Sequence, residues 1–147
     1  MKKSIPPNLL VGEAGVHRVA SELLKRGIQV YFPAIDNGID LFANRIALQV
    51  KAANRNKVGR YVFNFKSWRR EDGKPRYQKM NLHDDVKFVV LWGLNEDLLW
   101  VVPASVLRKS KQVQIGCSLA DSYRGAKGLR YSKYLDDWHN LCKRAGD

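Results

Sequence analysis

The sequence predicts an α/β protein with a mixed central β-sheet flanked by helices. Three observations lead to this prediction. The chain starts with an amphipathic stretch of helical period, continues with several strand-like runs, and closes with a second helical pattern. Because a sheet must bury its apolar faces, helices at both ends of a series of strands favour a layered architecture.

The first element is a helix, expected from about Leu9 or Leu10 to Arg26, with Gly27 as its stop. The segment IQVYFP, residues 28–33, is expected to be a short strand that leads away from this helix. The apolar stripe of the helix consists of Val16, Ala20, Leu23 and Leu24.

Residues 39–53 are expected to form a β-hairpin around a two-residue turn at Asn44-Arg45. The apolar residues alternate along both arms of the hairpin, as in a sheet with one buried face. They are Ile39, Leu41 and Ala43 on the first arm, and Ile46, Leu48 and Val50 on the second.

The turn also predicts a register, in which Leu41 faces Leu48 and Ile39 faces Val50. On the other face Asp40 then lies opposite Gln49, and Lys51 lies diagonal to Asp40. The polar groups of these three side chains would therefore converge.

The rest of the chain continues the alternation of strands and helices. The continuously apolar run at 86–93 is typical of a strand that is covered on both faces. We expect a single domain over 1–147, with its core at about 9–107 and a basic loop and C-terminal helix at 122–144. The expected elements are strands at 61–67, 86–93 and 98–103, a turn at Asp72-Gly73, a short helix from Pro103, a Gly-rich basic loop at 122–130 and a helix at 131–144.

The charge balance is the least ordinary property of the composition. Twenty-six Lys and Arg face 14 Asp and Glu, giving a formal net charge of +12, while the apolar fraction of 45% is that of a globular protein. So much positive charge favours an anionic partner, nucleic acid first and an anionic membrane second. The alternative is a basic surface that serves only solubility.

Several other classes of protein are excluded. The two cysteines form no CxxC pair, so a cysteine-built zinc site or redox motif is not expected. No apolar run reaches the roughly 18–20 residues of a membrane helix, and MKKSIPPNLL lacks the apolar core of a signal peptide. We expect a cytoplasmic protein, associated with the nucleoid if it binds DNA, and no membrane partner.

The polar face of the hairpin has two interpretations. Asp40, Gln49 and Lys51 are either a solvated surface with a cross-strand charge pair or a functional site. Glu13 favours the site, because it falls on or beside the apolar stripe of the first helix, where an unpaired carboxylate is costly. The alternative for Glu13 is a first-turn acid that interacts with the helix dipole.

Basic residues gather in two segments, at 55–79 and at 124–133. The ordinary interpretation of such a run is a solvated charged loop. Trp68 and Tyr77 interrupt the first run, and with the turn at Asp72-Gly73 they favour a basic β-ribbon of the kind that enters a major groove. The candidate DNA-binding residues are Arg55, Lys57, Arg60, Lys66, Arg69, Arg70, Lys74, Arg76, Lys79, Arg124, Lys127, Arg130 and Lys133.

Glu13 on a first helix, GID at 38–40 and QVK at 49–51 together resemble the PD-(D/E)XK nuclease superfamily. More narrowly, the chain resembles small intron-encoded homing endonucleases in which Gln replaces the second acid. GEAGVHRVASELLKRG, YFPAIDNGIDLFA, ALQVKAA and FVVLWGLNEDLLWVVPASVL carry the likeness over most of residues 9–107. The resemblance implies a restriction-endonuclease-like αβββαβ core.

The resemblance also implies roles for the hairpin residues. Asp40 matches the metal-ligating Asp, Glu13 an acid that binds metal directly or through water, and Lys51 the lysine that orients the attacking water. Gln49 stands where an acid is usual, and the backbone carbonyl of Val50 is a further ligand. Oxygen donors of this kind favour Mg²⁺, with Mn²⁺ as a substitute, and the missing acid favours one metal ion. Asp36 is the nearest alternative acid if the register is different.

The function implied is a Mg²⁺-dependent endonuclease for double-stranded DNA, with a site-specific homing endonuclease favoured. The alternatives are a Holliday-junction resolvase or other structure-specific nuclease, and a catalytically inactive DNA-binding module of the same fold. Cutting both strands generally requires two sites, so we expect a homo-oligomer, a dimer or tetramer.

Overall fold

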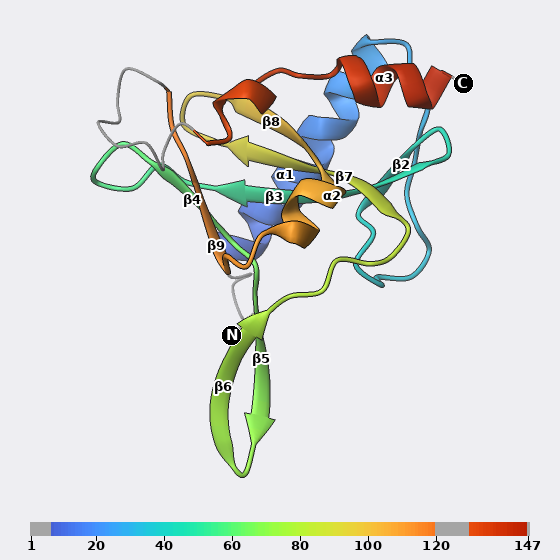
Figure 1. The fold of residues 1–147 in the computed structure, drawn as a ribbon. Coiled ribbons are helices and arrows are strands. Elements are labelled where there is room, and N and C mark those ends of the chain that lie inside the picture. Colours follow the sequence, from blue (N-terminus) through green and yellow to red (C-terminus); the bar gives the residue numbers. More distant parts are fainter. Residues whose placement is uncertain (1–6, 120–129, 147) are drawn as a thin grey trace, which may run out of the picture.

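The computed structural model describes residues 7–119 and 130–146. Figure 1 shows a central sheet with helices on both faces and a hairpin that projects from the body. None of the helices in the described part of the chain has the length and apolar character of a membrane span. The helical elements are α1 (Pro7–Lys25), α2 (Ala104–Lys109), the 3-10 turn η2 (Ser132–Tyr134) and α3 (His139–Gly146). The strands are β1 (Val30–Tyr31), β2 (Leu41–Ala43), β3 (Ile46–Ala53), β4 (Tyr61–Asn64), β5 (Lys66–Glu71), β6 (Lys74–Lys79), β7 (Val86–Gly93), β8 (Leu98–Pro103) and β9 (Gln114–Cys117).

The central sheet has five strands in the order β1-β2-β3-β7-β8. Only β3 and β7 run parallel, and the other neighbours are antiparallel, so the predicted mixed sheet is confirmed. Parallel neighbours require a crossover connection, which is usually a helix. Here the crossover, described along its whole length, contains β4, β5 and β6 instead.

Each face of the sheet has its own apolar core. On one face, α1 and α3 pack against alternate residues of the strands, including Leu48, Val90 and Val101. On the other face, α2, β4 and β9 cover the intervening residues, such as Val89 and Trp100. Because both faces are covered, β7 is buried along its length except at Lys87, as its continuous apolar run predicts.

Helix α1 ends close to its predicted stop, since Gly27 adopts a left-handed backbone with φ of 79°. Its buried stripe differs from the prediction: Val19 is fully buried, whereas Leu24 is 59% exposed. Gly15 faces β3, and a Cβ placed there would lie 3.0 Å from the Cβ of Ala52. Glycine therefore allows the first half of α1 to lie close to the strand that carries Gln49 and Lys51.

The hairpin of β2 and β3 has the predicted turn and register at its closed end. Leu41 pairs with Leu48, and Asn44 occupies the turn with φ of 52°. Beyond Leu41 the prediction is wrong, because the ladder stops there and Ile39 packs into the core on the opposite face of the sheet. The chain bends at Asp40, whose N–H donates to the Leu48 carbonyl at 2.9 Å.

The strand predicted at 61–67 is two strands with different partners. β4 pairs with β9, which the sequence did not reveal, while β5 pairs with β6 across the predicted turn at Asp72-Gly73. The change of partner occurs at Phe65, whose N–H donates to the Val113 carbonyl at 2.7 Å. We call β5, β6 and their turn, residues 66–79, the arm.

The single helix predicted at 131–144 is also wrong. The structure has η2, then an extended stretch, then α3. Leu135 forms a bridge to Trp100 at the edge of β8, and the Asp136 N–H donates to the Leu99 carbonyl at 2.8 Å. Pairing with the sheet edge therefore keeps the middle of this segment extended, although its apolar residues recur at helical spacing.

Candidate active site

A pocket of about 220 Å³ opens beside the first half of α1, where the chain approaches β2. One wall comes from α1 and the other from the loop that ends at Asp40. Its lining residues are Glu13, Val16, His17, Phe32, Pro33, Asp36, Ile39 and Asp40. The three carboxylates in this lining place acidic oxygens around one small volume, beside the strand that carries Lys51.

Asp40 is held in place by the strand opposite. Its Oδ2 accepts a hydrogen bond from the Val50 N–H at 2.7 Å. The other carboxylate oxygen has no hydrogen-bond donor among the described residues. Burial raises the pKa of Asp40 above its usual value; the Val50 N–H and the charge of Lys51 lower it, while Asp36 and Glu13 raise it further.

Lys51 is the cation of the site. Burial lowers the pKa of the Lys51 ammonium below its usual value, and the negative charge of Asp40 opposes that shift. Its Nζ lies 5.5 Å from the centre of the Phe65 ring, at the point where β4 passes into the arm. Asp40 and Lys51 therefore interact electrostatically in partly buried surroundings, as expected from the hairpin, and an aromatic face lies beside the ammonium.

Gln49 lies between Asp40 and Lys51 in the sequence. Its side chain is buried, with a relative exposure of 8%. Its side-chain oxygen, Oε1, is buried and has no hydrogen-bond donor within the part of the chain that the structure describes. An unsatisfied buried acceptor costs about 1–3 kcal/mol, a cost that a cation or a water molecule bound at this oxygen would offset. This oxygen has the chemistry of a ligand for a hard cation or of an acceptor for water.

Glu13 and Asp36 complete the acidic lining of the pocket from opposite walls. Both side chains are exposed, so Glu13 does not face the core as its spacing from the apolar stripe predicted. Glu13 reaches the pocket because the close contact at Gly15 brings this part of α1 against the sheet. The negative charges of Glu13 and Asp36 act on Asp40 even though both groups remain in solvent.

The donor set fits a hard divalent cation. In the described ranges, no three His, Cys, Asp or Glu side chains lie close enough together to hold a metal ion by themselves. A site here must therefore combine the Asp40 carboxylate with neutral oxygens, and the unpartnered Gln49 Oε1 and the Val50 backbone carbonyl are the neighbouring candidates. Oxygen donors without sulfur or imidazole suit Mg²⁺ or Mn²⁺ better than Zn²⁺.

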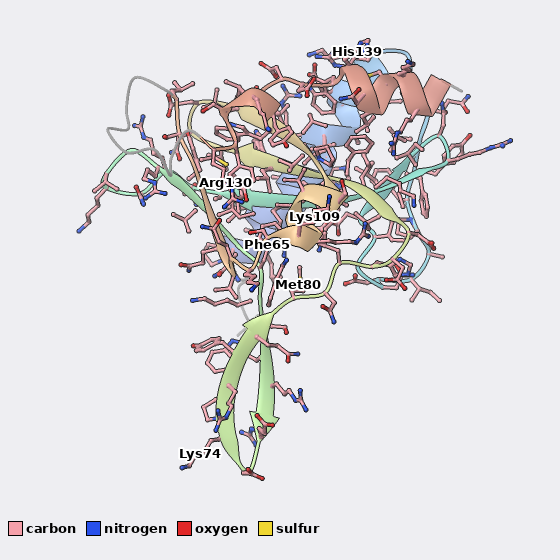
Figure 2. All side chains as sticks on the ribbon, in the orientation of Figure 1. Phe65, Lys74, Met80, Lys109, Arg130 and His139 are labelled. Carbon is pink, nitrogen blue, oxygen red and sulfur yellow. The ribbon has the colours of Figure 1, made fainter. Side chains whose placement is uncertain are left out.

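The arm displays most of the candidate DNA-binding residues of the first basic segment. Figure 2 shows Lys74 at its tip, pointing away from the body, with Phe65 where the chain leaves the body. Arg69, Arg70 and Arg76 are also exposed. Trp68 and Tyr77 pack against each other with tilted rings whose centroids are 4.0 Å apart, so the predicted ribbon of mixed aromatic and basic residues is present.

Other candidates from the same list have structural partners. Lys79 donates its ammonium protons to the carbonyls of Leu107, Arg108 and Ser110, which fastens the arm to the end of α2. Arg55 forms an ion pair with Glu96 at 3.3 Å. Lys79 and Arg55 therefore already have protein partners in the free chain, and their contact with DNA stays a prediction.

The remaining candidates are more scattered. Lys57 is exposed, whereas Arg60 is half-buried and leaves no room for a side chain at Gly116. Lys66 lies beside Tyr77 on the arm, and Lys133 lies beside Tyr134 on η2. Arg130 is exposed, while Arg124 and Lys127, with most of the predicted basic loop, fall outside the described residues.

Two features of the site escaped sequence reasoning. Phe65 contacts the Lys51 ammonium, although the alternating pattern at 61–65 indicated only a strand. His17 and Phe32 line the pocket with ring centroids 5.8 Å apart, and they come from segments that the sequence gave no reason to place together. Such contacts depend on how elements distant in the sequence pack together, and local periodicity carries no information about that packing.

Comparison with known proteins adds independent findings. A sequence model described as PD-(D/E)XK endonuclease matches residues 8–140. No curated protein matches the sequence. The solved structure of a bacterial homing endonuclease, I-Ssp6803I, has 23% sequence identity and a TM-score of 0.80, covering 96% of this chain and 97% of that chain. This likeness confirms the predicted restriction-endonuclease-like fold.

Proposed function

Because the chain belongs to the PD-(D/E)XK endonuclease family, we propose that it is a Mg²⁺-dependent enzyme that cleaves double-stranded DNA at specific sites. The resemblance predicted from Glu13, GID and QVK is confirmed at the level of the family. Membership makes the chain an endonuclease that acts on DNA, and members generally use divalent metal ions. The identity of the ion, the site residues and the specificity are our proposal.

One observation carries the assignment of the site: the Val50 N–H holds the Asp40 carboxylate at 2.7 Å. This bond directs one oxygen of Asp40 away from β3 and keeps the carboxylate near the Lys51 ammonium. Asp40, Gln49 Oε1 and the Val50 carbonyl would hold the metal ion, with Glu13 binding it directly or through water. When bound, Mg²⁺ supplies a Lewis acid for the phosphate.

Lys51 supplies the second charge that phosphodiester hydrolysis requires. Negative charge develops on the phosphate oxygens in the transition state, and an ammonium in partly buried surroundings stabilises it more than one in water does. Because burial lowers the pKa of Lys51, its Nζ also gives up a proton more readily than an exposed lysine does. Gln49 orients water through its amide oxygen but cannot serve as a strong base.

Site-specific cleavage is the finer part of the proposal. The chain shares its fold with a bacterial homing endonuclease along almost its whole length. It also has a net charge of +12 and an exposed basic arm, which suit a long contact with duplex DNA. Two copies would place one site on each strand, so we propose a homo-oligomer.

The test is cleavage of a supercoiled plasmid library that carries random inserts. We expect cutting at few positions with Mg²⁺ or Mn²⁺ and none with EDTA. Cleavage of a synthetic four-way junction in preference to linear duplex would replace site-specific cleavage with junction resolution. DNA binding without cleavage under any divalent ion would instead show a catalytically inactive binding module.

A further inference from the structure

The arm stands apart from the body as a two-stranded ribbon (Figure 1). Each of its strands has six residues, so it is about 20 Å long at roughly 3.3 Å per residue. A free two-stranded hairpin is marginally stable in water, so an arm of this length needs stabilising contacts. The register divides its side chains into two faces of different chemistry, because directly opposed residues share a face.

One face stabilises the arm. Trp68 lies opposite Tyr77, and their ring centroids are 4.0 Å apart. Lys66 places its ammonium over the Tyr77 ring at 5.2 Å. At the base of the arm, Lys79 binds carbonyls at the end of α2, and the Met80 N–H donates to the Phe65 carbonyl at 2.7 Å. This aromatic face therefore already has contacts of its own in the free protein.

The other face carries charge that the arm itself does not neutralise. Ser67 lies opposite Gln78, and Arg69 lies directly opposite Arg76. Like charges in opposed positions destabilise a strand pair. Arg76 has a partial counter-charge in Glu71 at 3.5 Å, with both side chains at least half exposed. Among the described residues Arg69 has no ion-pair partner, so an external anion would relieve the repulsion.

We propose that this polar face, formed by Ser67, Arg69, Arg76 and Gln78, lies in the major groove of duplex DNA and reads the base edges. The inference rests on the proposed function and names the surface that supplies its specificity. A major groove about 12 Å wide admits a two-stranded ribbon. Arginine binds guanine O6 and N7 with two hydrogen bonds, and glutamine binds adenine N6 and N7 in the same way.

The division of faces makes a matched test available. Arg69 and Arg70 are neighbours on the same strand, but Arg70 lies opposite Pro75 and so belongs to the aromatic face. Arg→Lys keeps the positive charge and removes the planar fork that contacts two acceptors at once. Arg69→Lys with Arg76→Lys therefore weakens base reading while leaving phosphate attraction, and Arg70→Lys is the control with the same chemistry.

The experiment selects binding sites from a random 30-bp duplex library, with Ca²⁺ in place of Mg²⁺ to prevent cleavage. The wild type should enrich a motif that includes guanines. Arg69→Lys/Arg76→Lys should lose preference at those guanines by about 10-fold or more for each contact, with an unchanged salt dependence of binding to non-specific DNA. Arg70→Lys should enrich the wild-type motif.

Two results with the variants would overturn the inference. One is a wild-type motif retained by Arg69→Lys/Arg76→Lys, and the other is an equal loss in Arg70→Lys, because both place base reading elsewhere. Melting temperatures and circular dichroism establish that the variants are folded. A wild type that cleaves DNA with Mg²⁺ but enriches no motif would refute base reading by the arm and would leave the nuclease assignment intact. Failure to bind or cut any duplex would refute the proposed function itself.

Discussion

The hairpin site and the arm are both antiparallel strand pairs with polar side chains, but they differ in burial. In the site, Gln49 is buried and the charges of Asp40 and Lys51 are partly removed from water. On the arm, Arg69 and Arg76 stand in solvent. Burial strengthens the effect of a charge on a neighbouring group and makes its placement costly, whereas exposed charges attract an anion over a distance with little cost to folding.

We propose that the two regions serve different parts of one reaction. A chemical step requires charges that act strongly at short range in a fixed geometry. The hydrogen bond from the Val50 N–H to the Asp40 carboxylate fixes the position of one such charge. Binding of a long anion requires many cations that each contribute a little. Substitutions in the site should therefore change the rate of cleavage, and substitutions on the arm should change affinity and specificity.

The largest effect should follow from changes in the site. Asp40→Asn and Lys51→Ala should each lower the rate of Mg²⁺-dependent cleavage by on the order of 10²–10³, because each removes a contact to the reacting phosphate or its metal. Binding of duplex DNA in Ca²⁺ should change little. Single-turnover cleavage and fluorescence anisotropy measure the two quantities. Wild-type rates in both variants, with a loss in Asp36→Asn instead, would show that the acid of the site is Asp36.

Removal of positive charge from the arm should change DNA binding and leave the rate of cleavage at saturation unchanged. Neutralising Arg69, Arg70, Lys74 and Arg76 should weaken duplex binding by tens of fold at low salt. The slope of log affinity against log salt should fall by roughly 0.9 for each cation that contacts phosphate. Cleavage of DNA at saturating enzyme should persist. Removing four exposed charges elsewhere, at Arg45, Lys109, Lys111 and Lys143, is the control; an equal loss there would mean that net charge, not the arm, binds DNA.

Gln49→Glu sharpens the comparison by adding charge to the buried region. The new carboxylate replaces an amide oxygen that has no donor, so Mg²⁺ should bind roughly tenfold more tightly. Without metal the same variant should unfold at a lower temperature, because its charge is buried and unpaired. Isothermal titration with Mg²⁺ and thermal melting with and without Mg²⁺ provide the readouts. Unchanged metal affinity would mean that Gln49 does not face the ion.

The cost of the buried charges should appear in stability. Burial raises the pKa of Asp40 and lowers the pKa of Lys51, so in both cases the folded state disfavours the charged form. Asp40→Asn/Lys51→Met removes both penalties and should be about 1 kcal/mol more stable than wild type in EDTA at pH 7. Lys51→Met alone leaves Asp40 without its counter-charge and should be less stable. Urea unfolding in which the double variant is the least stable would contradict a desolvation cost.

The smallest effect concerns an ion pair outside both regions, which gives a baseline for a structural charge. Asp97 accepts hydrogen bonds from Arg18 at 2.9 and 3.0 Å and from Trp92 at 2.7 Å, joining α1 to the β7–β8 turn. The Arg18 hydrogen bond is the main cause that lowers the pKa of Asp97. Its stabilisation is therefore present above the usual pKa of 3.8 and is lost as the pH falls through the lower folded value.

Asp97→Asn should thus cost about 1 kcal/mol at neutral pH, a difference that shrinks toward zero in acid. Denaturant unfolding of both proteins at pH 7 and at pH 3 tests this expectation. A difference that stays constant across this range would mean that packing at Asp97, and not its charge, joins the helix to the turn.

The closed end of the site hairpin was predictable because its information is local. The alternation around Asn44-Arg45 selects one register, since a shift by one residue would exchange the faces of the apolar and polar residues, and Leu41 does pair with Leu48. The prediction failed at Ile39, where the chain leaves the ladder and packs into the opposite core. Ile39 is buried whether the strand continues straight or bends at Asp40, so the alternation of apolar residues could not reveal the bend.

Partner choice between distant segments was not predictable for a similar reason. β4 pairs with β9, and Leu135 pairs with the edge of β8. Both pairings help to cover an apolar core that is assembled from distant parts of the chain. Helical spacing in 131–144 is compatible with a helix, yet pairing at the sheet edge stabilises an extended segment there. Such outcomes are decided by competition among tertiary contacts, which overrides local preference.

The sequence by itself therefore determined most strands of the central sheet, the hairpin turn, the basic arm and the residue types of the proposed site. These follow from periodicity, turn residues and charge, which act between neighbours along the chain. Only the tertiary structure decided that Glu13 lines the pocket from solvent, that Gln49 Oε1 is buried without a donor, and that Phe65 lies beside Lys51. Each of these depends on how closely separate elements pack, and Gly15 against Ala52 shows that the absence of one side chain sets that distance.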